Sequence, residues 1–234
     1  MTGANNTLFS RGMIAVLIAQ FVSALADNAL LFAAIALLRS QSAPDWQIPM
    51  LQEFFVIAFI LMAPFVGPIA DGFAKGRVML AANCIKLLGA TAMFLQVPPL
   101  LAYGLVGVGA AAYSPAKYGI LSELVAPDKL VKANGLIEGS TIVAILLGAV
   151  LGGKLADAST NIALISICGC YLLAATANTF IPKLPVARPD TKLQPSKLVK
   201  EFVAALSTLS LDKDARFSLI GSSIFWGAGS TLRL

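Results

Sequence analysis

The sequence predicts an all-α membrane protein with six hydrophobic spans and the start of a seventh. Of its 234 residues, 58% are hydrophobic and only 12% are charged, about half the charged fraction of a typical soluble domain. One compact core of this size cannot bury so many apolar side chains, so a bilayer must supply the remaining apolar environment. The apolar residues also gather in runs of about 20, the length that a helix needs to cross the hydrocarbon core.

The apolar runs predict the positions of the helices. We expect six of them, at Met13–Leu38, Leu51–Ala70, Val78–Val97, Leu100–Leu121, Asn134–Leu155 and Ile162–Ile181, and a seventh that opens near Phe217. The stretch 182–215 differs because it is long, polar and rich in Pro and Lys. We therefore divide the chain into a six-helix bundle (1–181), a cytoplasmic connector (182–215) and the start of the seventh span (216–234).

Two segments allow a second interpretation. Within the connector, apolar residues recur at helical spacing, which predicts either an interfacial helix on the inner leaflet or an ordinary amphipathic linker helix; they are Leu198, Phe202, Ala205, Leu206 and Leu209. The first run also fits a cleavable signal peptide, because Arg11 is followed by an apolar stretch and then by the A-x-A-like sequence Ala24-Leu25-Ala26. The apolar run resumes after Asn28, however, and its full length of ~39 Å is enough to span.

The distribution of basic residues predicts the orientation. If the amino terminus lies in the cytoplasm, most Lys and Arg residues outside the spans lie on that side, as the positive-inside rule requires. They are Arg11, Lys75, Arg77, Lys129, Lys132, Lys183, Arg188, Lys192, Lys197, Lys200, Lys213 and Arg216. Only Arg39 and Lys154 fall on the opposite side.

A short motif occurs twice and predicts internal symmetry. Gly67-Pro-Ile-Ala-Asp71 ends the second span, and Gly153-Lys-Leu-Ala-Asp157 ends the fifth. Because these spans run in opposite directions, the two copies lie on opposite faces of the membrane. Inverted three-helix repeats produce this arrangement.

Charges inside the spans indicate candidate functional residues, because one charge at mid-bilayer costs ~2.5–3.5 kcal/mol on insertion scales. Asp27 lies near the middle of the first span and Asn28 follows it. Arg233 lies beyond the middle of the seventh span. We expect Asp27 and Arg233 to interact in at least one state, either around a substrate or as a static salt bridge.

Two further cations lie within spans. Lys117 lies late in the fourth span and Glu138 lies early in the fifth, so both are expected near the cytoplasmic side. They could form an inner gate, or Lys117 could simply extend its ammonium to the interface. Lys86, about one-third into the third span, could reach the interface in the same way.

The composition argues against several functional classes. The sequence has no His, its three Cys do not have metal-site spacing, and we expect no metal or cofactor. It lacks a basic stripe interleaved with aromatic residues, so nucleic-acid binding is not expected. No catalytic constellation is visible either, and an enzyme is therefore not expected.

Four segments carry a resemblance to a known family. One is similar to the loop motif between the second and third helices of major facilitator transporters: Gly67-Pro-Ile-Ala-Asp71-Gly-Phe-Ala-Lys75-Gly-Arg77. In this segment Gly72 stands where that motif has a basic residue. The other three are more specific. They resemble segments of the bacterial lysophospholipid transporters of that superfamily: Tyr113-Ser-Pro-Ala-Lys117-Tyr-Gly-Ile-Leu-Ser-Glu123-Leu, Ala26-Asp27-Asn28-Ala-Leu-Leu-Phe and Phe225-Trp-Gly-Ala-Gly-Ser-Thr-Leu-Arg233.

The resemblance implies a flippase of the bacterial inner membrane. Such a protein moves lysophosphatidylethanolamine-type lipids from the outer to the inner leaflet by alternating access, and an acyltransferase/acyl-carrier-protein synthetase re-acylates them. Asp27 would take the ammonium of the head group, and Arg233 or Lys117 its phosphate. Family members have twelve helices, so we expect the 234-residue chain alone not to transport.

Other functions fit the same composition. A general facilitator that exports drugs or small solutes would share the fold without requiring the segment around Lys117. A membrane scaffold would leave Asp27 and Arg233 unexplained, and a membrane acyltransferase would lack the expected catalytic His.

Overall fold

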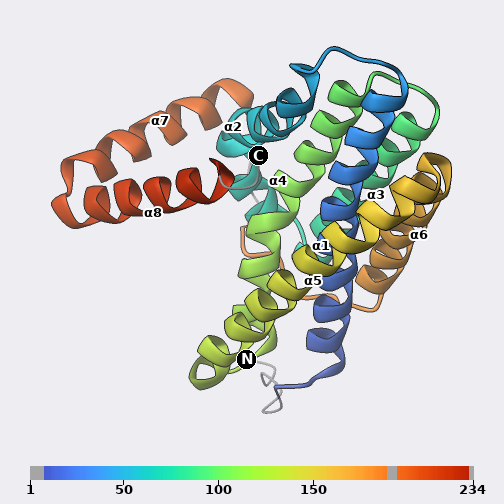
Figure 1. The fold of residues 1–234 in the computed structure, drawn as a ribbon. Helices are drawn as coiled ribbons and strands as arrows, with labels where there is room; N and C mark the ends of the chain where they lie inside the picture. Colours follow the sequence, from blue (N-terminus) through green and yellow to red (C-terminus); the bar gives the residue numbers. More distant parts are fainter. Residues whose placement is uncertain (1–7, 189–193, 232–234) are drawn as a thin grey trace. The chain divides into compact units, whose positions relative to one another are not determined.

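The computed structural model describes residues 8–188 and 194–231, which contain helices and no strands (Figure 1). The chain forms two compact units, Met1–Thr191 and Lys192–Leu234. The first unit holds six long helices: α1 (Arg11–Ser40), α2 (Gln47–Gly72), α3 (Lys75–Phe94), α4 (Pro99–Leu124), α5 (Leu130–Ala158) and α6 (Thr160–Thr179). A 3₁₀ turn at Pro127–Lys129 leads into α5.

Each of the six predicted runs coincides with one helix. Four helices extend two or three residues beyond the predicted carboxyl-terminal ends, whereas α3 and α6 stop short of them. α3 ends at Phe94 rather than Val97, because Gln96 has a φ of 65° and Pro98 follows. α6 ends at Thr179 rather than Ile181, just before Pro182. The local sequence thus stops both helices within a few residues of the predicted ends.

Five helices in the described part of the chain are long and apolar enough to cross a membrane: α1, α2, α3, the stretch Pro127–Ala158 that includes α5, and α6. α4 has 26 residues, ~39 Å at 1.5 Å per residue, and is also long enough. It is less apolar because Gly, Tyr, Ser and Lys residues replace aliphatic ones along it. Those small and polar residues face other helices, as described below.

The helix pairing has the symmetry that the repeated motif predicts. α1 packs on α5 and α6, α4 packs on α2 and α3, and α3 packs on α6 (Figure 1). Exchanging α1–α3 for α4–α6 maps this set of contacts onto itself, as expected for two inverted three-helix repeats. The two motif glycines also have matching surroundings, since a Cβ at Gly67 or Gly153 would meet no atom within 4 Å.

Small residues let the paired helices approach closely. A Cβ at Gly152 would lie 2.5 Å from the Ala29 Cα, and one at Gly148 would lie 2.5 Å from the Leu25 carbonyl oxygen. In the symmetry-related pair of α4 and α2, a Cβ at Gly107 would lie 2.8 Å from the Phe55 carbonyl oxygen. In lipid, such backbone contact replaces the hydrophobic effect as the source of helix association.

Buried apolar residues form two clusters at different heights of the bundle. One includes Met13 and Val16 of α1 together with Met79 and Ala82 of α3. The other includes Leu30 and later residues of α1 and Met93 of α3. The turns of α1 and α3 between these clusters carry polar side chains, so the bundle holds a polar layer between two apolar cores.

The second unit contains α7 (Pro195–Leu211) and α8 (Lys213–Thr231), which pack against each other. The helix predicted in the connector is confirmed as α7. The helix that contains the seventh run, α8, begins at Lys213, earlier than the predicted Phe217, because Asp212 caps it. Its carboxylate accepts hydrogen bonds from the backbone N–H groups of Asp214 and Ala215, both at 2.9 Å.

Candidate functional site

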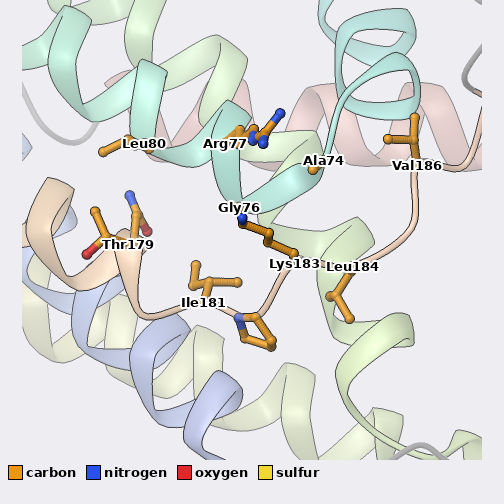
Figure 2. A pocket seen from close by; sticks show the side chains of 11 residues that line it. Ala74, Gly76, Arg77, Leu80, Thr179, Ile181, Lys183, Leu184 and Val186 are labelled. Atoms are coloured by element: carbon orange, nitrogen blue, oxygen red, sulfur yellow. The ribbon is translucent and has the colours of Figure 1, made fainter. Parts of the chain in front are cut away.

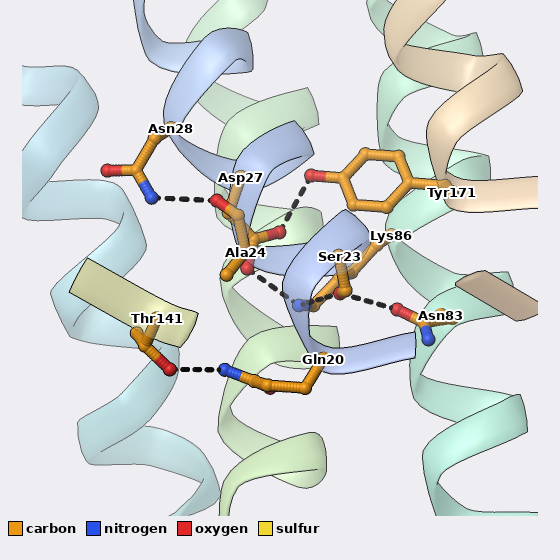
Figure 3. A network of polar contacts seen from close by, with 9 residues as sticks. All are labelled: Gln20, Ser23, Ala24, Asp27, Asn28, Asn83, Lys86, Thr141 and Tyr171. Atoms are coloured by element: carbon orange, nitrogen blue, oxygen red, sulfur yellow. Dashed lines mark hydrogen bonds and ion pairs between the residues drawn. The ribbon is translucent and has the colours of Figure 1, made fainter. Parts of the chain in front are cut away.

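The polar layer begins with one face of α1. Gln20, Ser23 and Asp27 are three and four residues apart, so they lie on the same side of the helix. Each contacts a different part of the bundle: Gln20 donates to Thr141 of α5 at 2.8 Å, and Ser23 donates to Asn83 of α3 at 2.7 Å (Figure 3). The layer therefore ties α1 to its neighbours through side chains from both repeats.

Asp27 is the centre of this network. Its Oδ2 accepts a charge-assisted hydrogen bond from Lys86 Nζ of α3 at 2.7 Å, and its Oδ1 accepts one from the Tyr171 hydroxyl of α6 at 2.8 Å (Figure 3). Lys86 also donates to the Ser23 hydroxyl at 3.0 Å. The carboxylate thus has one cationic and one neutral donor, which suits a charge held away from bulk water.

Lys86 does not extend to the membrane interface, although its position in the sequence allowed that possibility. Its side chain is 2% exposed and its ammonium points into the bundle, where it forms the ion pair with Asp27. The Asp27 side chain keeps 20% of its exposure. Snorkelling is not needed because a carboxylate lies within reach in the interior, and a paired charge costs far less than a single one.

Some polar atoms beside the pair have no partner. The Tyr113 hydroxyl and the Asn83 Nδ2 are buried without a hydrogen bond among the described residues. Lys86 Nζ lies 5.0 Å from the centre of the Tyr113 ring. A buried polar group without a partner is costly, so these atoms are positioned to bind a polar group that enters the layer.

The other two candidate residues of this site, Asn28 and Arg233, have different outcomes. Asn28 faces its own helix and donates from Nδ2 to the Ala24 carbonyl at 2.8 Å (Figure 3). Arg233 lies outside the described residues, so its interaction with Asp27 stays a prediction. The sequence reasoning missed Lys86 and Tyr171 as the partners that the structure gives to Asp27.

Lys117 and Glu138, predicted as an inner gate, do lie close together. Lys117 Nζ is 4.0 Å from Glu138 Oε1, and it also lies 4.3 Å from the centre of the Tyr118 ring. The Tyr118 hydroxyl donates to Glu138 at 2.6 Å. Lys117 is buried, whereas the Glu138 side chain is 47% exposed, so the contact joins the interior of α4 to the surface of α5.

The loop motif has an unexpected partner. Lys75, at the start of α3, is buried and forms an ion pair with Glu123, at the end of α4. Asp71 accepts a backbone hydrogen bond from Arg188 at 2.9 Å through its carbonyl oxygen, and its carboxylate lies 4.0 Å from the Arg188 guanidinium. Arg77 is exposed on the same turn. Charge therefore joins the start of α3 to the end of α4, and the end of α2 to the segment that follows α6.

Comparison with known proteins supports this architecture. The family model of the Major Facilitator Superfamily matches residues 16–233. The chain belongs to the major facilitator superfamily. Six helices in two inverted repeats are the facilitator arrangement, and the described unit has the helix pairing that this arrangement requires.

Three facilitators from Salmonella are similar to almost the whole chain. The lysophospholipid transporter LplT of Salmonella heidelberg (strain SL476) is 57% identical over 229 residues, which is 98% of this chain. The proteins of the same name from Salmonella newport (strain SL254) and Salmonella typhimurium (strain LT2) are each 56% identical over the same length. The chain spans 57% of the length of each of these relatives.

Proposed function

We propose that this chain takes part in moving lysophospholipids across a membrane, and that the Asp27–Lys86 pair recognises the head group. The observation that carries the proposal is a partly buried carboxylate 2.7 Å from a buried ammonium, in the polar layer of a multi-pass facilitator. Charges in such a place are costly and are retained for function more often than for stability. Relatives that are 57% identical bear the name of lysophospholipid transporters.

The pair matches the chemistry of a zwitterionic lipid. The head group of lysophosphatidylethanolamine has an ammonium, which a carboxylate can bind, and a phosphate, which a cation can bind. Without substrate, Asp27 and Lys86 neutralise each other. On binding, Asp27 exchanges Lys86 for the lipid ammonium, and Lys86 turns to the lipid phosphate, so neither charge is left alone.

Neighbouring groups can support this exchange. The Tyr171 hydroxyl keeps its hydrogen bond to Asp27 Oδ1 and holds the carboxylate in place. The unpartnered Tyr113 hydroxyl and Asn83 amide offer donors to a phosphate oxygen. Arg233 remains a candidate for a second phosphate ligand, and Asn28 lies beside the site as a further polar side chain.

The remaining features fit alternating access. Lys117 and Glu138 form the inner gate, which opens when the two charges separate. The distribution of basic residues supports an amino terminus in the cytoplasm, with the protein in the bacterial inner membrane. Lipid then moves from the outer to the inner leaflet, where an acyltransferase/acyl-carrier-protein synthetase can re-acylate it. The chain takes part in transport and carries out no covalent chemistry.

Uptake of labelled lysophosphatidylethanolamine into spheroplasts tests the proposal. The chain would be expressed alone and joined to the remaining length of a Salmonella relative, each with Asp27 or with Asp27→Asn. We expect uptake by the joined protein and a loss of at least about tenfold with Asp27→Asn, the cost of one charge-assisted hydrogen bond. Absence of uptake by a well-expressed joined protein would overturn the assignment of the substrate.

A further inference from the structure

A pocket lies away from the Asp27 network, where the end of α6 meets the start of α3. Its volume is about 350 Å³, within the range of small-molecule sites. The lining comes from the first turns of α3, the last residues of α6 and the segment that follows α6 (Figure 2). These elements all belong to the first unit of the chain.

The charged residues of the pocket are both cations. Arg77 and Lys183 line it, and Figure 2 shows the Lys183 side chain running toward the first turn of α3. None of the eleven described residues that line the pocket is acidic, and neither cation has a carboxylate within salt-bridge distance in residues 8–188 and 194–231. The pocket therefore has unneutralised positive charge.

The start of α3 adds backbone donors. Its N-cap residue is Ala74, which has no side chain that could accept a hydrogen bond from the first turn. Ile181 lies against this turn, since a Cβ at Gly76 would be 3.0 Å from the Ile181 Cγ2. Free N–H groups and the positive end of the helix dipole favour an anion at such a terminus.

A buried amide in the pocket wall gives independent evidence for a ligand. Asn178 is 3% exposed, and neither its Oδ1 nor its Nδ2 has a hydrogen-bond partner in the structure. Leaving both groups of an amide unpaired is costly, and the cost is relieved if a ligand or its hydration shell supplies partners. The Asn178 Nδ2, the Arg77 and Lys183 side chains and the α3 backbone are all donors, so the matching ligand is rich in acceptors.

We propose that this pocket binds a phosphate group. The phosphate can belong to the head group of an anionic phospholipid or be free in solution, and both sources present the same acceptor oxygens. Leu80, Leu184 and Val186 provide apolar walls that can contact the glycerol and first acyl carbons of a lipid. The site is separate from the Asp27 network and does not rest on the proposed transport activity.

Calorimetric titration of the purified full chain in neutral detergent tests the site. The ligands are dihexanoyl-phosphatidylglycerol, inorganic phosphate at constant ionic strength, and dihexanoylglycerol, which has no phosphate. We expect saturable binding of a phosphate-bearing ligand and none of dihexanoylglycerol. Binding of the lipid alone identifies a head-group site, and binding of inorganic phosphate alone identifies a free-phosphate site. Equal binding of dihexanoylglycerol, or no binding of either phosphate, would overturn the proposal.

Variants distinguish the pocket from general charge attraction. Lys183→Gln is expected to raise the Kd about tenfold, the loss of one charge-assisted hydrogen bond. The matched control is Lys132→Gln, which removes an exposed cation near the start of α5, outside the pocket, and should leave the Kd unchanged. Asn178→Leu should also weaken binding without lowering the Tm of the free protein, because it removes unpaired polar atoms. The same loss in Lys132→Gln as in Lys183→Gln would contradict the proposed site.

Discussion

Lys86 Nζ of α3 lies 2.7 Å from Asp27 Oδ2 of α1, in the layer that separates the two apolar cores of the bundle. The pair joins two helices that otherwise have few direct contacts, since α1 packs mainly on α5 and α6. A buried ion pair of this kind adds little net stability, but removing one partner leaves the other charge uncompensated. Variants that remove one partner are therefore expected to lose more stability than a variant that removes both.

Removing the ammonium alone should destabilise the bundle. Lys86→Met leaves Asp27 without its cation, and we expect a loss of about 3 kcal/mol in the free energy of unfolding, the lower end of the range for a buried pair. The lower end applies because the Asp27 side chain is 20% exposed. The double variant Asp27→Asn with Lys86→Met should recover most of that loss in denaturant unfolding. If the two single losses simply add, the residues are not coupled.

Two tyrosines should respond in opposite ways to loss of their hydroxyl groups. Tyr171→Phe removes the donor to Asp27 Oδ1 and should cost about 1.5–3 kcal/mol, as for hydrogen bonds to charged groups. Tyr113→Phe removes a buried hydroxyl that has no partner, so the Tm should stay the same or rise. Both are measured by thermal unfolding in detergent. Equal Tm losses would mean that the network does not depend on the Tyr171 hydroxyl.

Adjacent glycines in α5 should differ in their tolerance of a methyl group. Gly152→Ala places a Cβ 2.5 Å from the Ala29 Cα, and such overpacking costs about 1–3 kcal/mol. Gly153→Ala meets no atom within 4 Å, so it should gain up to about 1 kcal/mol from helix propensity. Denaturant unfolding of the two variants gives the comparison. A stable Gly152→Ala protein would show that α1 and α5 are not in backbone contact.

The proposed inner gate should affect function more than stability. Lys117 and Glu138 are 4.0 Å apart and the Glu138 side chain is 47% exposed, so Glu138→Gln should change the free energy of unfolding by less than about 1 kcal/mol. The same variant should alter lysolipid uptake by the joined protein, because the gate loses its closing charge. The comparable variant Glu201→Gln, in the exposed Lys197–Glu201 pair of α7, should change neither quantity.

The sequence predicted the helices well because apolar runs and prolines act locally. The six runs and the amphipathic helix at α7 depend on residues near one another in the chain. The start of α8 was predicted too late, because hydropathy begins at Phe217 whereas the helix begins at the cap formed by Asp212. The capping residue Asp212, five residues before Phe217, could have corrected that boundary.

The partner of Asp27 could not be read from hydropathy. A lysine one-third into a span can reach either the interface or the interior, and only the packing of α1 against α3 decides between them. A signal was present in the spacing, however. Gln20, Ser23 and Asp27 share one face of α1, and Asn83 and Lys86 are three residues apart on α3. Two polar faces in otherwise apolar helices are expected to meet each other inside the bundle.

Binding of lysolipids to the purified protein tests the central claim that Asp27 and Lys86 recognise the two charges of the head group. Lysophosphatidylethanolamine has both charges, whereas lysophosphatidic acid has the phosphate without the ammonium. We predict that Asp27→Asn raises the Kd of lysophosphatidylethanolamine about tenfold or more and leaves that of lysophosphatidic acid nearly unchanged. Equal Kd values for lysophosphatidylethanolamine in the parent protein and in Asp27→Asn would contradict the account.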